Sequence, residues 1–407
     1  MFVTRLMSTA AVCILVLTGC GAEHRSATAS NLNQIDAAEF RRVVEDAATA
    51  LLVPGAVVAL RTPQGSFDVA VGTTELGSAN APDVQTRFRI ASNTKTMTAA
   101  LVMLLAQDGK LALDDSVGTY VAGVPNGANI TVEELLTMRS GLYGYTDDPE
   151  LAEQLDLDPA RAWTPQQVLA IAYRHPPRFA PGTEYDYSNT NYALLGLVAE
   201  KTGGRPLAEQ FQDRLLDPLN LDQTTVPAVD DTTIPAPGSH GYMYGPTRYA
   251  LFDEPYPESM QAEARAGTLQ PIDYTNQNPS YATAAGGVIS TADNLLTWIR
   301  SLVTGEVLAA DTQQRWLAGL RAEDPDQPGG KQYGYGITHQ RFGQNAAMYY
   351  HGGELPGFNS FMGHDPENDV TLVIWTNLTL SPDGQTTANA MLPPILDEIY
   401  AGLTLAS

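Results

Sequence analysis

Residues 90–95 read Ile-Ala-Ser-Asn-Thr-Lys, and the segment that follows them has the apolar spacing of a helix. Apolar side chains recur there every three or four residues, as on the buried face of a helix, at Met97, Leu101, Leu104 and Leu105. Gly109 is placed to end this helix. The spacing therefore predicts that Ser92 lies at or just before a helix N-terminus, with Lys95 one turn later on the same face.

Ser92 and Lys95 form a Ser-x-x-Lys pattern that has chemical consequences in this position. Unpaired backbone N–H groups and the positive end of the helix dipole stabilise an oxyanion and disfavour a protonated lysine. A buried Lys95 can then accept the Ser92 proton. The alternative is a serine that only caps the helix beside a solvated lysine. The chain holds 4 Lys and 17 Ser, so about 0.2 such matches are expected by chance, and this one opens an apolar helix.

A second candidate segment contains Tyr187 and Asn189, which follow the turn at residues 181–182. In an extended loop, two residues at this spacing point to the same side. A tyrosine hydroxyl can relay protons if a nearby charged lysine lowers its pKa, and an asparagine amide can hold a substrate carbonyl. From this segment alone, an asparagine helix cap beside a core tyrosine is favoured.

A third candidate is His351-Gly352-Gly353, at the predicted end of an apolar strand. The two glycines would let a substrate backbone approach the edge of the sheet. The alternative is a histidine that is merely hydrogen-bonded. Residues 284–288, Ala-Ala-Gly-Gly-Val, precede a capped helix and are interpreted as tight packing without chemistry of their own.

Residues 1–19 have the features of a secretory signal peptide, with Arg5 before a short apolar stretch at residues 10–17. That stretch is too short to span a membrane. The end, Leu-Thr-Gly-Cys at 17–20, resembles the lipobox of bacterial lipoproteins, in which Cys20 would be lipidated. The alternative is an ordinary cleaved signal. Residues 20–35 are expected to be a flexible tether. The signal peptide and the lipobox together predict an exported protein that is anchored by lipid to the cell membrane and faces the periplasm or the outside.

The chain is acidic, with a formal net charge of −23 spread along its 407 residues. This charge argues against nucleic acid as a partner and against electrostatic binding to anionic lipid. The length beyond the tether and the 43% hydrophobic content suffice for one large domain or two lobes.

Periodicity and turn signals predict strands near both ends of the chain and helices between them. The expected elements are a helix at 36–52, strands at 56–61, 66–72, 333–338, 346–350, 358–363 and 370–376, short helices and loops at 114–277, a helix at 291–302 and a closing helix at 386–403. This order suggests one sheet built from both ends of the chain, with a mainly helical lobe at about 112–280 inserted in an α/β lobe. A site is expected in the cleft between them.

Taken together, the order Ser-x-x-Lys, Tyr-x-Asn, His-x-Gly resembles the penicillin-recognising serine hydrolases. It is most similar to the branch holding the serine D-alanyl-D-alanine carboxypeptidases, class C β-lactamases and related esterases. The segments that carry the resemblance are 88–92, 135–142, 187–192 and 351–353, within a domain at 36–403. The resemblance implies an α/β (α+β) fold of β-lactamase type, with an antiparallel sheet flanked by the N- and C-terminal helices.

Residue by residue, the resemblance implies Ser92 as nucleophile, Lys95 as its proton acceptor and Tyr187 as the acid and base of acylation and deacylation. Asn189 would orient the substrate, with His351 lining the opposite wall.

The resemblance also implies substrate contacts along Gly352 and Gly353. The oxyanion hole would be formed by the Ser92 backbone N–H and by one on the strand just after Gly353. Such acyl transfer needs no cofactor or metal. The chain has no Gly-x-Ser-x-Gly elbow and no His-Glu-x-x-His pattern, which disfavours an α/β-hydrolase and a zinc enzyme.

The sequence departs from the carboxypeptidase pattern at the residues that hold a substrate's terminal carboxylate, which we call the clamp. The carboxypeptidases carry a basic residue on the strand before the histidine, where this chain has Thr338, and Gly352 and Glu354 stand where hydroxyls would help. On a regular strand Gln340 shares the side of Thr338 and Arg341 points away.

We therefore expect an esterase-like enzyme, with D-alanyl-D-alanine carboxypeptidase as the alternative. The substrate would be an ester, a D-alanyl peptide or a β-lactam. The competing class is a non-catalytic lipoprotein that binds peptidoglycan or β-lactams.

Overall fold

The computed structural model describes residues 31–252 and 254–403. The predicted signal peptide at 1–19, Cys20 and the tether as far as residue 30 lie outside the described residues. Within the described part, no helix combines the length and the apolar character needed to cross a bilayer.

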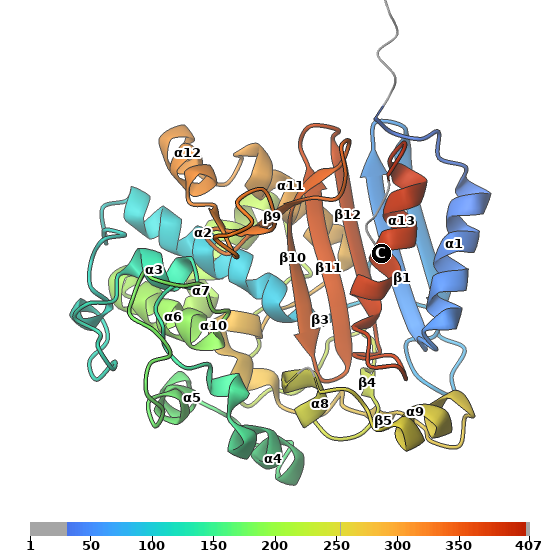
Figure 1. Cartoon of the computed structure of the whole chain (residues 1–407), viewed down its shortest axis with the longest axis horizontal. Helices are drawn as coiled ribbons and strands as arrows, with labels where there is room; N and C mark the ends of the chain where they lie inside the picture. Colours follow the sequence, from blue (N-terminus) through green and yellow to red (C-terminus); the bar gives the residue numbers. More distant parts are fainter. Residues whose placement is uncertain (1–30, 253, 404–407) are drawn as a thin grey trace, which may run out of the picture. The chain divides into compact units, whose positions relative to one another are not determined.

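An eight-stranded antiparallel sheet forms the centre of the fold, in the order β2-β1-β12-β11-β10-β9-β8-β7 (Figure 1). The strands from the two ends of the chain meet where β1 pairs with β12. The bounds are β1 (Gly55–Thr62), β2 (Gly65–Gly72), β7 (Arg321–Ala322), β8 (Gln332–Tyr333), β9 (Thr338–Arg341), β10 (Ala347–Leu355), β11 (Phe358–Asp365) and β12 (Val370–Thr376). The predicted mixed fold with an antiparallel sheet is confirmed.

Two helices from the ends of the chain, α1 (Ala37–Ala50) and α13 (Thr387–Ile399), lie together against one face of the sheet (Figure 1). Asp36 caps α1 as predicted, because its carboxylate accepts hydrogen bonds from the backbone of residues 38 and 39. The alternation along β1 sends Val58 to this face and Val57 to the other, where α2 (Thr94–Gln107) and α11 (Ala292–Thr304) pack. Both faces of the sheet are thus buried.

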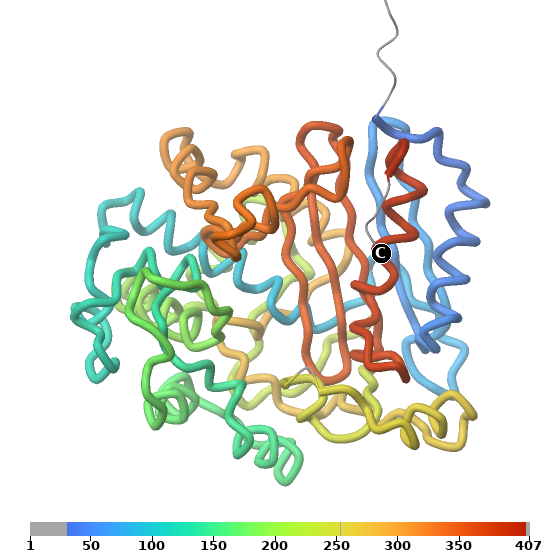
Figure 2. Tube along the Cα trace, in the orientation of Figure 1, coloured from blue at the N-terminus to red at the C-terminus, as the bar shows by residue number. Residues whose placement is uncertain are grey.

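Between β2 and β7 the chain forms mostly short helices, and its cyan to green part lies to one side of the sheet (Figure 2). These helices are α3 (Val132–Leu136), α4 (Pro149–Leu157), α5 (Pro165–Ala172), α6 (Asn189–Gly203), α7 (Leu207–Phe211), α8 (Arg248–Leu251), α9 (Glu258–Arg265), α10 (Thr283–Gly286) and α12 (Ala310–Ala318). The same part of the chain contains two short antiparallel strand pairs. These are β3 (Phe88–Arg89) with β6 (Ile289–Ser290) and β4 (Tyr242–Met243) with β5 (Ile272–Asp273).

The structure corrects two of the predicted strands. Of the segment predicted at 333–338, only Tyr333 and Thr338 are in strands, at the end of β8 and the start of β9, and residues 334–337 form a turn closed by a hydrogen bond from the Gly334 N–H to the Ile337 carbonyl. Its aromatic and β-branched residues favour a strand, but Gly336 has φ of +72°, which ends the extended run. The other strand, predicted at 346–350, continues as β10 through His351 to Leu355.

Candidate active site

Ser92 lies in a single 3₁₀ turn, Ala91–Asn93, directly before α2, as the sequence predicted. The preceding Ala91 has φ of +50°, a conformation that costs about 1–3 kcal/mol for a residue with a Cβ. The Asn93 amide stabilises the turn by donating to the Ile90 carbonyl at 3.0 Å and to the Ser360 hydroxyl at 2.9 Å. The turn that carries the nucleophile is thereby fastened to β11.

Lys95 is fully buried, and its Nζ atom lies 2.9 Å from Ser92 Oγ. The same nitrogen donates to Asn189 Oδ1 at 2.7 Å and to the Ala285 carbonyl at 2.8 Å. Burial lowers the pKa of Lys95 well below its ordinary value. Because both of these oxygens can only accept, they take the two hydrogens of a neutral amine and leave its lone pair facing the Ser92 hydroxyl. Lys95 is therefore arranged as a base for Ser92.

Asn189 is the first residue of α6. Its amide nitrogen donates to the Thr146 hydroxyl at 3.0 Å, which fixes the orientation of the amide and turns its oxygen toward Lys95. Both ends of the amide are thus engaged by the protein. The sequence predicted that Asn189 orients the substrate; the structure shows it holding Lys95, which makes it a positioning residue.

Ala285 was expected to take no part in the chemistry, and that prediction is wrong. It lies in α10, and its backbone carbonyl is one of the three partners of Lys95. A backbone carbonyl has the same chemistry at every residue, so only the fold could reveal this contact.

Tyr187 leaves 37% of its surface exposed, and its ring centre lies 4.9 Å from Lys95 Nζ. Burial of the hydroxyl raises the pKa of Tyr187, while the interaction of that hydroxyl with Ser92 lowers it by a smaller amount. The condition stated for a proton relay through this tyrosine was a charged lysine that lowers its pKa. Burial instead favours the neutral forms of both Tyr187 and Lys95. A neutral phenol next to Ser92 can pass a proton onward.

His351 is buried on the wall of the site. Its Nδ1 lies 2.6 Å from the Gly352 carbonyl, which can only accept, so Nδ1 carries the proton and Nε2 accepts from the Tyr333 hydroxyl at 3.2 Å. Burial lowers the pKa of His351 to about 3. The side chain is therefore a neutral part of the wall, where the resemblance placed it.

The two glycines after His351 differ in what their missing side chains permit. A Cβ on Gly353 would stand 2.3 Å from the Ile90 carbonyl oxygen and 2.5 Å from the Ser360 hydroxyl, so only glycine lets β10 pack against the nucleophile turn. A Cβ on Gly352 would find no atom closer than 3.6 Å. Room for a substrate therefore comes from Gly352, whereas Gly353 is required by the packing of the protein itself.

These residues surround a cavity of about 480 Å³, which we call the site cavity. The predicted site residues that line it are Ser92, Tyr187, Thr338, His351, Gly352 and Gly353. Lys95 and Asn189 stand behind this surface. Glu354 also lines the cavity, together with Lys331, which sequence reasoning missed. In the sequence Lys331 follows two glycines, as in a loop, and carries no motif that would mark it as a site residue. Its Nζ lies 3.3 Å from a carboxylate oxygen of Glu323.

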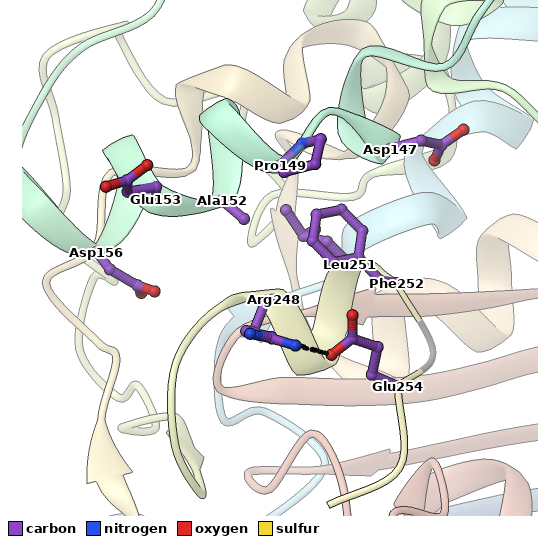
Figure 3. A pocket seen from close by; sticks show the side chains of 9 residues that line it. All are labelled: Asp147, Pro149, Ala152, Glu153, Asp156, Arg248, Leu251, Phe252 and Glu254. Atoms are coloured by element: carbon purple, nitrogen blue, oxygen red, sulfur yellow. Dashed lines mark hydrogen bonds and ion pairs between the residues drawn. The ribbon is translucent and has the colours of Figure 1, made fainter.

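A larger cavity of about 830 Å³ lies between α4 and α8 and contains none of the predicted site residues (Figure 3). Its wall carries the ion pair of Arg248 and Glu254 beside three further carboxylates, Asp147, Glu153 and Asp156. No nucleophile with an adjacent base lines this cavity among the described residues. In that same part of the chain, no three His, Cys, Asp or Glu side chains are grouped to hold a metal ion.

Comparison with known proteins gives the family and the fold of the chain. The family model described as Beta-lactamase matches residues 40–392. A D-stereospecific amidohydrolase from Streptomyces sp. is 30% identical, with a TM-score of 0.74 over 88% of this chain and 99% of that one. The D-amino acid amidase from Ochrobactrum anthropi SV3, in complex with L-phenylalanine, has a TM-score of 0.72 at 24% identity, over 88% of this chain and 96% of that one. At that identity the likeness is one of fold.

Among curated proteins, the unguisins hydrolase of Aspergillus violaceofuscus (strain CBS 115571) is 24% identical over 282 residues, which are 66% of this chain and 45% of that protein. The chain spans about half to two thirds of the length of the first curated relatives it matches.

Proposed function

Because this chain belongs to the beta-lactamase family, we propose that it is a serine hydrolase that cleaves an ester or amide through an acyl-enzyme on Ser92. The observation that carries the proposal is the buried Lys95 amine, 2.9 Å from Ser92 Oγ, with its other two contacts made by pure acceptors. The experiment that tests it is the loss of turnover in Ser92→Ala, argued in the Discussion.

In the acylation step, Ser92 Oγ attacks the substrate carbonyl carbon and its proton passes to Lys95 Nζ. The oxyanion that forms is stabilised by the backbone N–H groups of Ser92 and Glu354, which belong to the nucleophile turn and to β10. Tyr187 relays the proton to the departing alcohol or amine, and the carbon–oxygen or carbon–nitrogen bond breaks. The acyl group is left on Ser92.

Deacylation repeats these events with water as the nucleophile. Water attacks the ester carbonyl of the acyl-enzyme while its proton passes through the Tyr187 hydroxyl to Lys95 Nζ. The bond to Ser92 Oγ breaks, the proton returns to Ser92, and the acid is released.

The absence of a basic residue at the position of Thr338 affects which substrates the enzyme can bind, because such a residue would hold a terminal carboxylate. Thr338 lines the site cavity, whereas Arg341 is half exposed, with a nitrogen 3.9 Å from a Glu367 oxygen. The Gln340 side chain accepts from the Tyr350 hydroxyl. None of these groups offers a free cation to a terminal carboxylate. The name of the Streptomyces relative, an amidohydrolase, supports amides beside esters as substrates.

We expect neutral short-chain esters to be hydrolysed faster than D-alanyl-D-alanine peptides. Loss of one charge-assisted hydrogen bond costs about 1.5 to 3 kcal/mol, hence roughly 10- to 150-fold in kcat/KM for the peptide, before repulsion by Glu354 is counted. The double variant Thr338→Arg with Glu354→Thr is expected to reduce the ratio of kcat/KM between the ester and the peptide. Comparing kcat/KM for the two substrates in both proteins measures this.

Arg341→Ala is the control and is expected to change neither rate. Efficient D-alanine release by the wild type that disappears in Lys331→Gln would show that Lys331 holds the carboxylate. That result would contradict the expected preference for neutral substrates.

We also propose that the protein is a lipoprotein of the cell envelope, anchored to the membrane through Cys20. The support is the sequence, in which the apolar stretch ends at a small residue followed by cysteine. Cys20→Ser is expected to release the protein from the membrane fraction or to leave it unprocessed, with Cys13→Ser as the matched control. Normal membrane retention of a processed Cys20→Ser protein would contradict the anchor.

A further inference from the structure

The site cavity extends beyond the reacting groups, around the edge of β10. Among the described strands, β9 pairs only with residues 347–350 of β10, so the edge from His351 onward is left uncovered by a strand on that side. Successive side chains of β10 point to opposite faces of the sheet. His351 and Tyr350 nevertheless line the same cavity, and Tyr350 packs on the face covered by α1 and α13. The cavity therefore passes over this edge from one face of the sheet to the other.

The strand register identifies the part of the cavity on the α13 face, which we call the far pocket. Residues directly opposite each other in an antiparallel pair lie on the same face. Tyr350 is opposite Thr338, and Gly352 is opposite Phe361. Helix α13 covers this face and contributes two further residues. The far pocket is thus lined by Thr338, Tyr350, Gly352, Phe361, Asn389 and Leu392.

The missing side chain of Gly352 joins the far pocket to the reacting groups. A Cβ at this position would point toward α13, with Asn389 Oδ1 at 3.9 Å and no atom closer than 3.6 Å. No side chain of residue 352 therefore covers the ring of Phe361, which stands opposite on β11. A larger residue at 352 would fill the entrance, so glycine keeps the far pocket open to a substrate.

The walls of the far pocket are mainly apolar. The rings of Tyr350 and Phe361 are stacked, with centres 5.1 Å apart and planes at 28°. Leu392 adds an aliphatic side chain that is 8% exposed. The Tyr350 hydroxyl is already engaged, because it donates to Gln340 Oε1 at 2.7 Å. Such walls bind aromatic or branched aliphatic groups, which stack on the rings or meet their edges.

No charge in the far pocket selects an ionic group, since none of its six residues is charged. Two charged residues line the rest of the site cavity, and both are engaged within the protein. Lys331 forms an ion pair with Glu323, and Glu354 has an interaction partner of its own. Burying an ion in an apolar pocket without a counter-ion is costly. The chemistry of the far pocket thus favours an uncharged occupant.

The position of the far pocket along β10 indicates which part of the substrate enters it. In the proposed mechanism the Tyr187 hydroxyl gives a proton to the departing alcohol or amine. The ring centres of Tyr187 and His351 are 6.2 Å apart, and His351 directly precedes Gly352. The oxyanion is held farther along the strand, at the N–H of Glu354. The departing group therefore lies on the side of the entrance at Gly352.

We propose that the far pocket binds the leaving group of the substrate, an uncharged alcohol or amine that carries an aromatic or branched aliphatic group. The inference rests on the proposed function, because a leaving group exists only if Ser92 is acylated. It adds the chemical class of the leaving group. It also gives Gly352, Phe361 and Leu392 a role in determining specificity.

The test uses three esters, which are ethyl butyrate, benzyl butyrate and ethyl phenylacetate. The two butyrates form the same acyl-enzyme, so they share one rate of deacylation and differ only in acylation. Burial of the benzyl ring is expected to make kcat/KM for benzyl butyrate about 10-fold or more higher than for ethyl butyrate. Ethyl phenylacetate carries its ring in the acyl part and reports on that side of the site.

Gly352→Val is expected to remove most of the preference for benzyl butyrate over ethyl butyrate, because its methyl groups fill the entrance and valine suits a strand. The ratio of ethyl phenylacetate to ethyl butyrate is expected to fall much less. Leu392→Ala removes part of the apolar wall and is expected to lower the benzyl preference by a smaller factor. Comparing variants cancels the difference in intrinsic reactivity between the esters.

Leu403→Ala is the matched control for Leu392→Ala. Both leucines are 8% exposed and belong to the same core cluster, but Leu403 does not line the site cavity. The control is expected to keep the wild-type ratio between the two butyrates.

Equal kcat/KM for the two butyrates in the wild type would overturn the inference while leaving the acyl-enzyme intact. The same holds if folded Gly352→Val keeps the benzyl preference, or if Leu392→Ala lowers it no more than Leu403→Ala does. A selective loss of ethyl phenylacetate hydrolysis in Gly352→Val would place the acyl group in the far pocket and refute the assignment to the leaving group. A wild type that hydrolyses none of the three esters, and whose Ser92 does not label, would overturn the proposed function itself.

Discussion

Ser92→Ala is expected to abolish both turnover and covalent labelling by a fluorescent penicillin or a fluorophosphonate probe. The change removes the only oxygen at this position that can form the acyl bond, and no nearby group replaces it. The fold is expected to survive, because the turn is held by Asn93 and Ser360 and not by the Ser92 hydroxyl. Initial rates on a short-chain ester and gel fluorescence after labelling measure the two effects.

Ser66→Ala provides the control, since Ser66 is an exposed serine on β2. That variant is expected to hydrolyse the ester and to label like the wild type. Substantial turnover by folded Ser92→Ala protein would refute the assignment of the nucleophile.

Lys95→Ala is expected to lower kcat/KM by roughly 10² to 10⁴, the usual loss when a positioned base is removed. The pH dependence follows from the direction of its pKa shift. Only the neutral amine can accept the Ser92 proton, so kcat/KM is expected to be retained above the lowered pKa of Lys95 and to fall as the pH drops through it. A pH–rate profile of the wild type and the variant measures both effects.

Lys110→Ala is the matched control for this prediction, because Lys110 is exposed and lies three residues beyond the end of α2 at Gln107. It is expected to leave the profile unchanged. If Lys95→Ala kept a fast rate with the same loss of activity at low pH, another group would have to be the base.

The parts of the site that sequence reasoning found are those set by local pattern. Ser92 and Lys95 are one helical turn apart, so their meeting depends only on the predicted helix. The strands at 56–61, 66–72, 358–363 and 370–376, which are β1, β2, β11 and β12 in the structure, were predicted for the same reason, since alternation and turn signals are local features.

The contacts that define the state of Lys95 could not be predicted, because they join segments far apart in the chain. Asn189 and Ala285 lie 94 and 190 residues from Lys95 and reach it only in the folded protein. Gly353 was assigned to the substrate because its close approach to Ile90 also appears only in the fold.

The most direct measurement is to identify the residue that carries the acyl group. The protein is incubated with the fluorophosphonate probe, digested, and analysed by peptide mass spectrometry. We predict one adduct per chain, on the peptide containing Ser92, which forms more slowly in Lys95→Ala and is absent in Ser92→Ala. An adduct on another residue, or one that persists in Ser92→Ala, would contradict the acyl-enzyme mechanism.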